Sequence, residues 1–161
     1  MSLPKTPSFR VDGRKALVTG AGRGIGRASA VALADAGADV VLAARTGAEV
    51  DALADEIRAT GGQASGLALD VSDLEATRAA VSEHGPFQIL VNNAGTNRPA
   101  FLQDITEDDY DLVTDLNVRS VVFLTQTVAK GLQDIGLSGS IINISSQMGH
   151  VGGPKRTVYC A

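Results

Sequence analysis

Short apolar runs alternate along this chain with longer stretches of helical pattern. Two of the runs, residues 40–44 and 89–91, are apolar at every position. A strand with one solvent-exposed face alternates apolar and polar residues. A continuously apolar strand is therefore covered on both faces, as in a parallel sheet between two layers of helices. We therefore predict an α/β fold: a doubly wound, Rossmann-like parallel sheet with helices on both faces.

The alternation gives five βα units, of which the last is unfinished. We expect strands near residues 15–19, 39–44, 64–69, 88–92 and 140–145, and helices near 24–36, 47–60, 73–83 and 107–134. Ser72 and Asp73 supply an N-cap oxygen before the third helix. Residues 1–12 are predicted to form an extended arm ending at an Asp12–Gly13 turn, and residues 13–161 a single domain whose C-terminal strands are missing from this chain.

Composition and charge exclude several classes of function. Fourteen basic residues against eighteen acidic ones give a net charge of −4, and the basic residues do not cluster, so we expect no nucleic-acid partner. The single cysteine cannot form an internal disulfide, and no spacing of cysteine and histidine resembles a metal site. No apolar run is long enough for a signal peptide or a membrane span. We expect a cytoplasmic protein with no metal and no membrane contact.

A glycine-rich segment, residues 19–26, follows the first predicted strand and opens the first predicted helix. This is the context of a phosphate-binding turn, because a helix N-terminus offers free N–H groups and a positive dipole. Gly20 allows a sharp turn, Gly24 lets the backbone approach a pyrophosphate, and Gly26 lets the helix pack close to the strand. The alternative is a tight turn that binds nothing. The spacing Gly-x3-Gly-x-Gly resembles that of the short-chain dehydrogenase/reductase family.

Other segments match the same family, from about Asp12 to the last residue. The resemblance implies that Asp70 and Val71 hold an adenine ring; taken alone, Asp70 could equally be a helix N-cap. In the segment 92–95, it implies that the asparagines brace the sheet while small residues line the cofactor. The predicted cofactor-binding residues are Gly20, Arg23, Gly24, Ile25, Gly26, Arg45, Asp70, Val71, Asn93, Ala94 and Gly95.

The resemblance also implies three catalytic residues. Ser146 follows the fifth predicted strand and stands thirteen residues before Tyr159, which is the interval of the family. Tyr159 would donate a proton to a carbonyl oxygen as hydride reaches the carbon, and Ser146 would hydrogen-bond the developing alkoxide. Asn117, inside the predicted helix 107–134, would bend that helix and hold a water of the proton relay. The alternative for Asn117 is an exposed polar residue.

The end of the second predicted strand favours NADP(H), with NAD(H) as the alternative. An NAD enzyme normally carries an acidic residue there to hold the ribose hydroxyls, but this chain has Ala44 followed by Arg45. The guanidinium of Arg45 can pair with a 2′-phosphate, and Arg23 can reach the same group.

These observations predict an oxidoreductase that transfers hydride between NADP(H) and a secondary alcohol or ketone, such as a 3-oxoacyl thioester, a sugar acid or a small cyclic ketone. One alternative is an NADP(H)-binding module with impaired catalysis. Another is a sugar-nucleotide epimerase or dehydratase, which the glycine spacing disfavours. The resemblance further implies a homo-oligomer, either a dimer or a tetramer, of the complete protein.

The last residues carry two further predictions. The chain stops at residues 159–161, before the lysine of the family's Tyr-x3-Lys motif, so we expect the 161-residue chain alone to be inactive and a lysine to lie two positions beyond Ala161. Lys155 and Arg156 lie between Ser146 and Tyr159. We predict that they contact an anionic edge of substrate or cofactor; the alternative is plain solvation.

Overall fold

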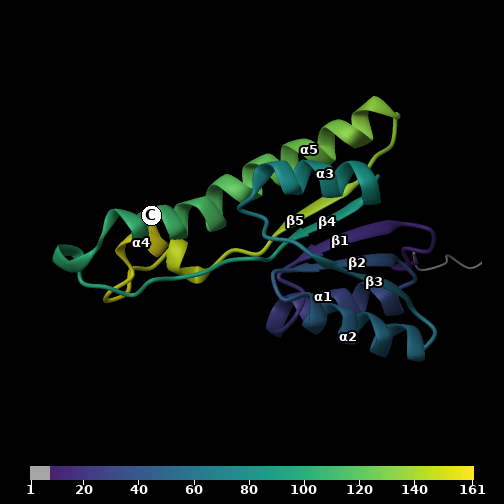
Figure 1. The fold of residues 1–161 in the computed structure, drawn as a ribbon, viewed down its shortest axis with the longest axis horizontal. Helices are drawn as coiled ribbons and strands as arrows, with labels where there is room; N and C mark the ends of the chain where they lie inside the picture. The colour runs from purple at the N-terminus through teal and green to yellow at the C-terminus, as the bar shows by residue number, and fades with distance from the viewer. Residues whose placement is uncertain (1–7) are drawn as a thin grey trace, which may run out of the picture.

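The sheet is parallel, as predicted, in the computed structural model, which describes residues 8–161 (Figure 1). Five strands lie side by side in this part of the chain, in the order β3-β2-β1-β4-β5. They are β1 (Lys15–Thr19), β2 (Asp39–Ala44), β3 (Gln63–Ala68), β4 (Ile89–Asn92) and β5 (Ser140–Asn143). The chain winds outward in one direction from β1 to β3, then returns to the other side of β1 with β4. The order in which successive strands are added to the sheet therefore reverses between β1 and β4.

Helices cover both faces of this sheet (Figure 1). On one face lie α1 (Gly24–Asp35) and α2 (Gly47–Ala59), and on the other lie α3 (Leu74–His84) and α5 (Ser120–Asp134). The side chain of Asp73 accepts hydrogen bonds from two backbone N–H groups in the first turn of α3, as expected of an N-cap residue. The doubly wound α/β fold predicted from the sequence is confirmed.

The apolar strands serve two separate cores. Successive side chains of a strand point to opposite faces, so Val18 and Leu42 pack in the core under α1 and α2. Their neighbours Leu17 and Val41 pack in the second core, together with Leu124 of α5. This two-sided burial explains why β1 and β2 show no alternation of apolar and polar residues.

The predicted helix 107–134 is present with those bounds, but it is not α-helical throughout. It consists of α4 (Glu107–Thr114), a π-helical turn η2 (Asp115–Arg119) and α5, with Asn117 at the centre of the wide turn. The predicted arm falls mostly outside the described residues, since the structure describes only residues 8–12 of it. The predicted Asp12–Gly13 turn is present, with Gly13 at φ 72°.

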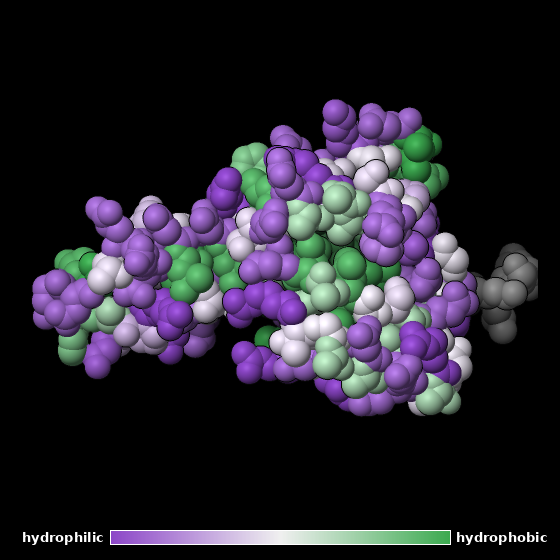
Figure 2. Space-filling view, in the orientation of Figure 1, coloured by the Kyte–Doolittle hydropathy of each residue, from purple (hydrophilic) through white to green (hydrophobic). Residues whose placement is uncertain are grey.

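The segments after β4 and β5 extend away from the sheet (Figure 1). We call this part the extension; it contains α4, the 3₁₀ helices η1 (Leu102–Asp104) and η3 (Gln147–Gly149), and α6 (Thr157–Cys160). Strand β5 is an edge of the sheet, and its Ile141 and Ile142 are 38% and 45% exposed. In Figure 2, hydrophobic surface gathers between the two helical layers, within a largely hydrophilic surface. Among residues 8–161, no helix is both long and apolar enough to cross a membrane.

Candidate functional site

A cleft of about 650 Å³ lies where β1, β2, β3 and β4 end at their carboxyl edges. In open α/β sheets this edge, next to the point where the strand order reverses, is where ligands bind. Ten of the eleven predicted cofactor-binding residues line the cleft, and the eleventh, Gly26, lies behind them in α1. The lining residues are Gly20, Gly22, Arg23, Gly24, Ile25, Ala44, Arg45, Thr46, Glu49, Leu69, Asp70, Val71, Asn93, Ala94, Gly95 and Leu116.

The glycine turn has the backbone conformation that its sequence predicts. Gly20 and Gly24 have φ values of 62° and 57°, a region that L side chains rarely adopt. A Cβ atom added to Gly26 would overlap the carbonyl oxygen of Gly20 and lie 2.5 Å from Nδ2 of Asn93. The N-cap residue Arg23 makes no side-chain hydrogen bond to the helix, so the first N–H groups of α1 remain open to a ligand.

A buried hydroxyl joins this turn to the end of β4. Thr19 Oγ1 accepts hydrogen bonds from the backbone N–H groups of Asn93 and Ala94, both at 3.0 Å, and donates to Val91 O at 3.3 Å. The side chain of Asn93 donates in return to the carbonyl oxygens of Thr19 and Gly20, at 2.9 Å and 3.2 Å. Thr19 is not among the predicted cofactor-binding residues, although a hydroxyl after three apolar strand residues was a visible signal.

Asn92 points away from the cleft and braces the sheet. Its Nδ2 donates to Asn143 Oδ1 in β5 at 2.8 Å and to Thr125 Oγ1 in α5 at 3.0 Å. The adjacent asparagines therefore have different partners: Asn92 fixes β4 to β5, and Asn93 fixes β4 to the glycine turn. Bracing was the role that the resemblance implied for this pair.

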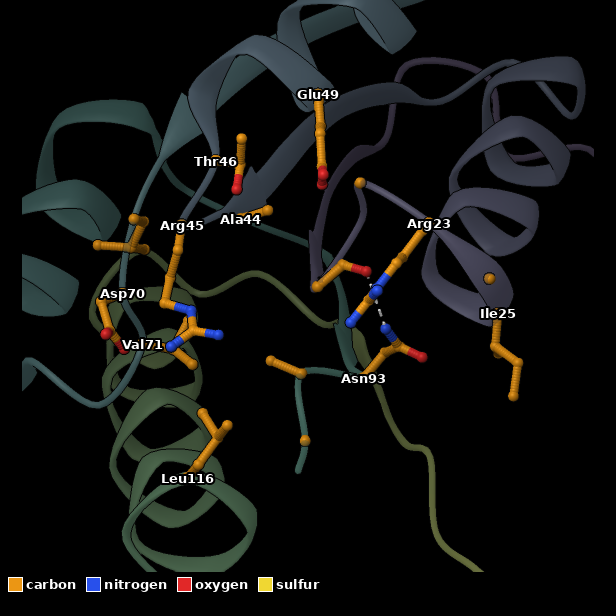
Figure 3. Close-up of a pocket in the computed structure, with 16 residues that line it drawn as sticks. Arg23, Ile25, Ala44, Arg45, Thr46, Glu49, Asp70, Val71, Asn93 and Leu116 are labelled. Carbon is orange, nitrogen blue, oxygen red and sulfur yellow. Dashed lines mark hydrogen bonds between the residues drawn. The ribbon is translucent and has the colours of Figure 1, made fainter. Parts of the chain in front are cut away.

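Charged side chains of both signs reach the cleft. Arg23 and Arg45 extend into it from opposite sides, and Glu49 points from α2 toward the glycine turn (Figure 3). Asp70 accepts hydrogen bonds from the backbone N–H and the hydroxyl of Ser72, at 3.0 Å and 2.7 Å. Partial burial raises the pKa of Asp70, but these hydrogen bonds and the charge of Arg45 outweigh it and hold that pKa below its usual value. Asp70 is therefore ionised at neutral pH.

Asn117 holds the loop that follows β4. Its Oδ1 accepts from Thr96 N and its Nδ2 donates to Thr96 O, both at 2.8 Å. A Cβ atom on Gly95 would lie 3.2 Å from the same Oδ1. Asn117 thus contacts the backbone of Gly95 and Thr96, in the loop at the rim of the cleft. Its neighbour Leu116 lines the cleft itself.

Ser146 and Tyr159 lie in the extension and do not line the cleft. Ser146 follows β5, and its Oγ accepts a hydrogen bond from Met148 N at 3.2 Å, capping η3. Tyr159 is half-buried in α6, and α6 packs against η3. The structure thus brings together the two segments that carry these residues.

Lys155 has an unusual conformation, with φ 60° in a residue that is not glycine. Its ammonium lies 4.5 Å from the centre of the Phe101 ring, and its carbonyl accepts from Ala100 N at 3.1 Å. The pair joins the loop after β4 to the loop that leads into α6. The contact of Lys155 and Arg156 with an anionic ligand stays a prediction.

Six of the lining residues are absent from the predicted cofactor-binding residues: Gly22, Ala44, Thr46, Glu49, Leu69 and Leu116. Thr46 and Glu49 follow the end of β2 with the spacing of a capping box, a pattern that indicates a structural role at a helix start. In the structure, however, the Thr46 side chain makes no capping hydrogen bond to α2. The local pattern therefore gave no sign that both residues face the cleft.

The site and fold together correspond to a known family. The model of the short chain dehydrogenase family matches residues 14–161, which is nearly all of the chain. This chain belongs to the short-chain dehydrogenase family. The enzymes of this family that it resembles are oxidoreductases, among them an L-xylulose reductase from Bos taurus that is 43% identical over 156 residues. The match covers 95% of this chain but 61% of that relative, so the chain spans about three fifths of the relative's length.

Solved structures agree with this assignment. A gluconate 5-dehydrogenase from Burkholderia cenocepacia J2315, in complex with NADP and tartrate, superimposes with a TM-score of 0.88 at 38% identity, over 95% of this chain and 61% of that one. A 7α-hydroxysteroid dehydrogenase complexed with NADH superimposes with a TM-score of 0.88 at 35% identity, over 95% of this chain and 61% of that one. Family members of this similarity therefore bind either cofactor.

Proposed function

We propose that this chain is the cofactor-binding part of an oxidoreductase that transfers hydride between NADP(H) and a secondary alcohol or ketone. The observation that carries the choice of cofactor is the end of β2. Ala44 stands where an acidic side chain would hold the ribose hydroxyls of NAD, and the next residue, Arg45, lines the cleft opposite Arg23. Two guanidinium groups suit a phosphate better than a hydroxyl.

The rest of the cleft fits a dinucleotide. The open N–H groups at the start of α1 would hold the pyrophosphate, which the positive φ of Gly20 and Gly24 allows to approach closely. Ala94 and Gly95 leave space for a flat ring, and Asp70 and Val71 lie at the other end for the adenine. The nicotinamide ring of the bound cofactor would supply or accept the hydride.

Three residues outside the cleft lining would handle the proton and the substrate. Tyr159 would donate a proton to the carbonyl oxygen, and Ser146 would hydrogen-bond the same oxygen as negative charge develops on it. Asn117 would hold a water for proton relay at the loop that it fixes. A free tyrosine has a pKa of about 10, so Tyr159 needs positive charge nearby to act at neutral pH.

The named relatives favour a polyhydroxylated substrate. The L-xylulose reductase and the gluconate 5-dehydrogenase act, by their names, on a ketose and on a sugar acid. We propose a substrate of this class for the complete protein. The direct test is turnover of ketoses and sugar acids with NADPH by the product of the complete gene. Cofactor binding without turnover of any of them would instead support a binding module that lacks catalysis.

The cofactor assignment is tested by calorimetric binding of NADP⁺ and NAD⁺. We expect NADP⁺ to bind more tightly, and Arg45→Ala to weaken it about tenfold or more while leaving NAD⁺ nearly unchanged, since a hydrogen bond to a charged group contributes about 1.5–3 kcal/mol. Ala44→Asp should shift the preference toward NAD⁺. Arg78→Ala, which removes an exposed arginine of α3 outside the cleft, is the matched control. Equal or tighter binding of NAD⁺ by the unchanged protein would refute the assignment.

A further inference from the structure

The cleft contains a carboxylate that the proposed function does not use. Glu49 lies in the first turn of α2 and lines the cleft together with Arg23 and Arg45. Its side chain leans against the glycine turn: a Cβ atom on Gly22 would overlap Oε2 of Glu49 and lie 3.2 Å from its Cβ and 3.4 Å from its Cδ. Figure 3 shows the Glu49 carboxylate directed at the same space as the two arginines.

In the part of the chain that the structure describes, this carboxylate takes no part in a capping box. A Thr-x-x-Glu sequence at a helix start commonly forms a capping box, in which the glutamate returns to the backbone N–H of the N-cap residue. Here neither half of the box forms its side-chain hydrogen bond. Within residues 8–161, the Glu49 carboxylate makes no hydrogen bond and no ion pair, whereas Glu56, two turns further along α2, pairs with Arg27. A capping hydrogen bond therefore does not account for the position of Glu49.

The charges that line the cleft are balanced. Two arginines, Arg23 and Arg45, face two carboxylates, Asp70 and Glu49. Asp70 is held by Ser72 and lies at the adenine end of the proposed site. Glu49 is the carboxylate beside the glycine turn, on the side where Arg23 and Arg45 would receive a 2′-phosphate.

We propose that Glu49 is a specificity-determining residue that limits the preference of this cleft for NADP(H) over NAD(H). A 2′-phosphate bound between the two arginines brings almost two negative charges close to the Glu49 carboxylate, while the uncharged 2′-hydroxyl of NAD(H) does not. The repulsion opposes part of the attraction that the arginines supply. This inference rests on the proposed function, because it takes the two arginines as the 2′-phosphate site.

Glu49→Gln keeps the shape of the side chain and removes its charge. For exposed charges several ångströms apart, we expect the variant to bind 2′,5′-ADP about three- to tenfold more tightly than the unchanged protein. Binding of 5′-AMP, which lacks the 2′-phosphate, should change less than about twofold. The gain should shrink between about 0.02 M and about 0.2 M salt, since the Debye length falls over this range. Calorimetry with these two nucleotides isolates the 2′-phosphate from the rest of the cofactor.

Asp55→Asn is the matched control. Asp55 lies on the same helix, its loss changes the net charge by the same amount, and it pairs with Arg58 outside the cleft. We expect this control to leave the binding of both nucleotides unchanged. If Glu49→Gln changes 2′,5′-ADP binding no more than Asp55→Asn does, the inference is wrong. It is also wrong if Glu49→Gln weakens 5′-AMP, because the carboxylate would then be holding a ribose hydroxyl.

The unchanged protein separates this inference from the proposed function. If it prefers 2′,5′-ADP to 5′-AMP and Glu49→Gln has no effect, only the role of Glu49 is lost. If it shows no preference, the proposed NADP(H) assignment is lost, and the inference falls with it unless Glu49→Gln creates the preference.

Discussion

Gly26→Ala tests whether the glycine turn needs close contact between α1 and β1. Alanine is normally the better residue inside a helix, by about 1 kcal/mol. At this position, however, the new methyl group would overlap Gly20 O and lie 2.5 Å from Asn93 Nδ2 and 2.9 Å from the carbonyl carbon of Gly20. Two of these three atoms belong to the backbone, so the helix or the turn has to move.

The expected cost follows from these contacts. Forcing a methyl group into a closely packed contact costs about 1–3 kcal/mol. The displaced Asn93 side chain also loses its hydrogen bonds to Thr19 O and Gly20 O, each of which contributes about 1 kcal/mol. After the gain in helix propensity is subtracted, we expect a loss of about 3 kcal/mol in the free energy of unfolding. For a domain of this size the melting temperature would fall by about 6–12 °C.

The assay is urea unfolding monitored by circular dichroism. Calorimetry on the same samples measures the binding of NADP⁺. Gly131→Ala is the matched control, because Gly131 lies inside α5 and a Cβ atom there meets nothing within 4 Å. The control should be stabilised by up to about 1 kcal/mol. A Gly26→Ala protein as stable as the control, with cofactor binding intact, would refute the reasoning that Gly26 is required by backbone contact.

Three further changes probe the same region. Thr19→Val keeps the shape of the side chain but leaves the partly buried N–H groups of Asn93 and Ala94 without an acceptor, so urea unfolding should show a loss of about 2–4 kcal/mol; a loss below about 0.5 kcal/mol would contradict this role. Asn117→Ala removes two hydrogen bonds to the loop after β4, and hydrogen exchange of that loop should become faster, whereas unchanged protection would show that other contacts hold the loop. The lowered pKa of Asp70 contributes stability above the ordinary pKa of about 3.9 and loses it as pH falls through the folded value, so Ser72→Ala should destabilise most at pH 7 and progressively less in acid, as Asp70 becomes protonated. An effect of Ser72→Ala that does not change between neutral and acidic pH would rule out that linkage.

The pattern of hydrophobic residues was sufficient to predict the strands of the sheet and the helices that cover it. Predicted and observed boundaries of β1 and β2 agree, because each strand is buried on both faces and is followed by a glycine or a charged residue. The glycine turn was equally readable, since positive φ at Gly20 and Gly24 restricts the residue type at those positions. Local sequence determines these features, so local sequence predicts them.

The π-helical turn within the helix 107–134 was harder to predict from the sequence. Asn117 was recognised as a poor helix former, but helix propensity does not distinguish an exposed asparagine from one whose side chain holds another segment. Its partner is the backbone of Thr96, 21 residues away in the chain. Backbone groups leave no trace in the side-chain pattern, so the residues alone did not predict a π-helical turn here, although the family resemblance implied a bend at Asn117.

Glu49 shows a second limit, in which a local pattern was consistent with a role that the structure does not support. A threonine and a glutamate at capping-box spacing would ordinarily be assigned to the start of α2. The structure instead leaves both side chains free of the helix and directs Glu49 at the glycine turn, because β1 and β2 are neighbours and their carboxyl ends share one edge. The charge in the cleft therefore depends on which strands are adjacent, a property of topology. Cofactor preference inferred from the end of β2 and the glycine turn counts two arginines, whereas the folded cleft also contains the opposing carboxylate beside them.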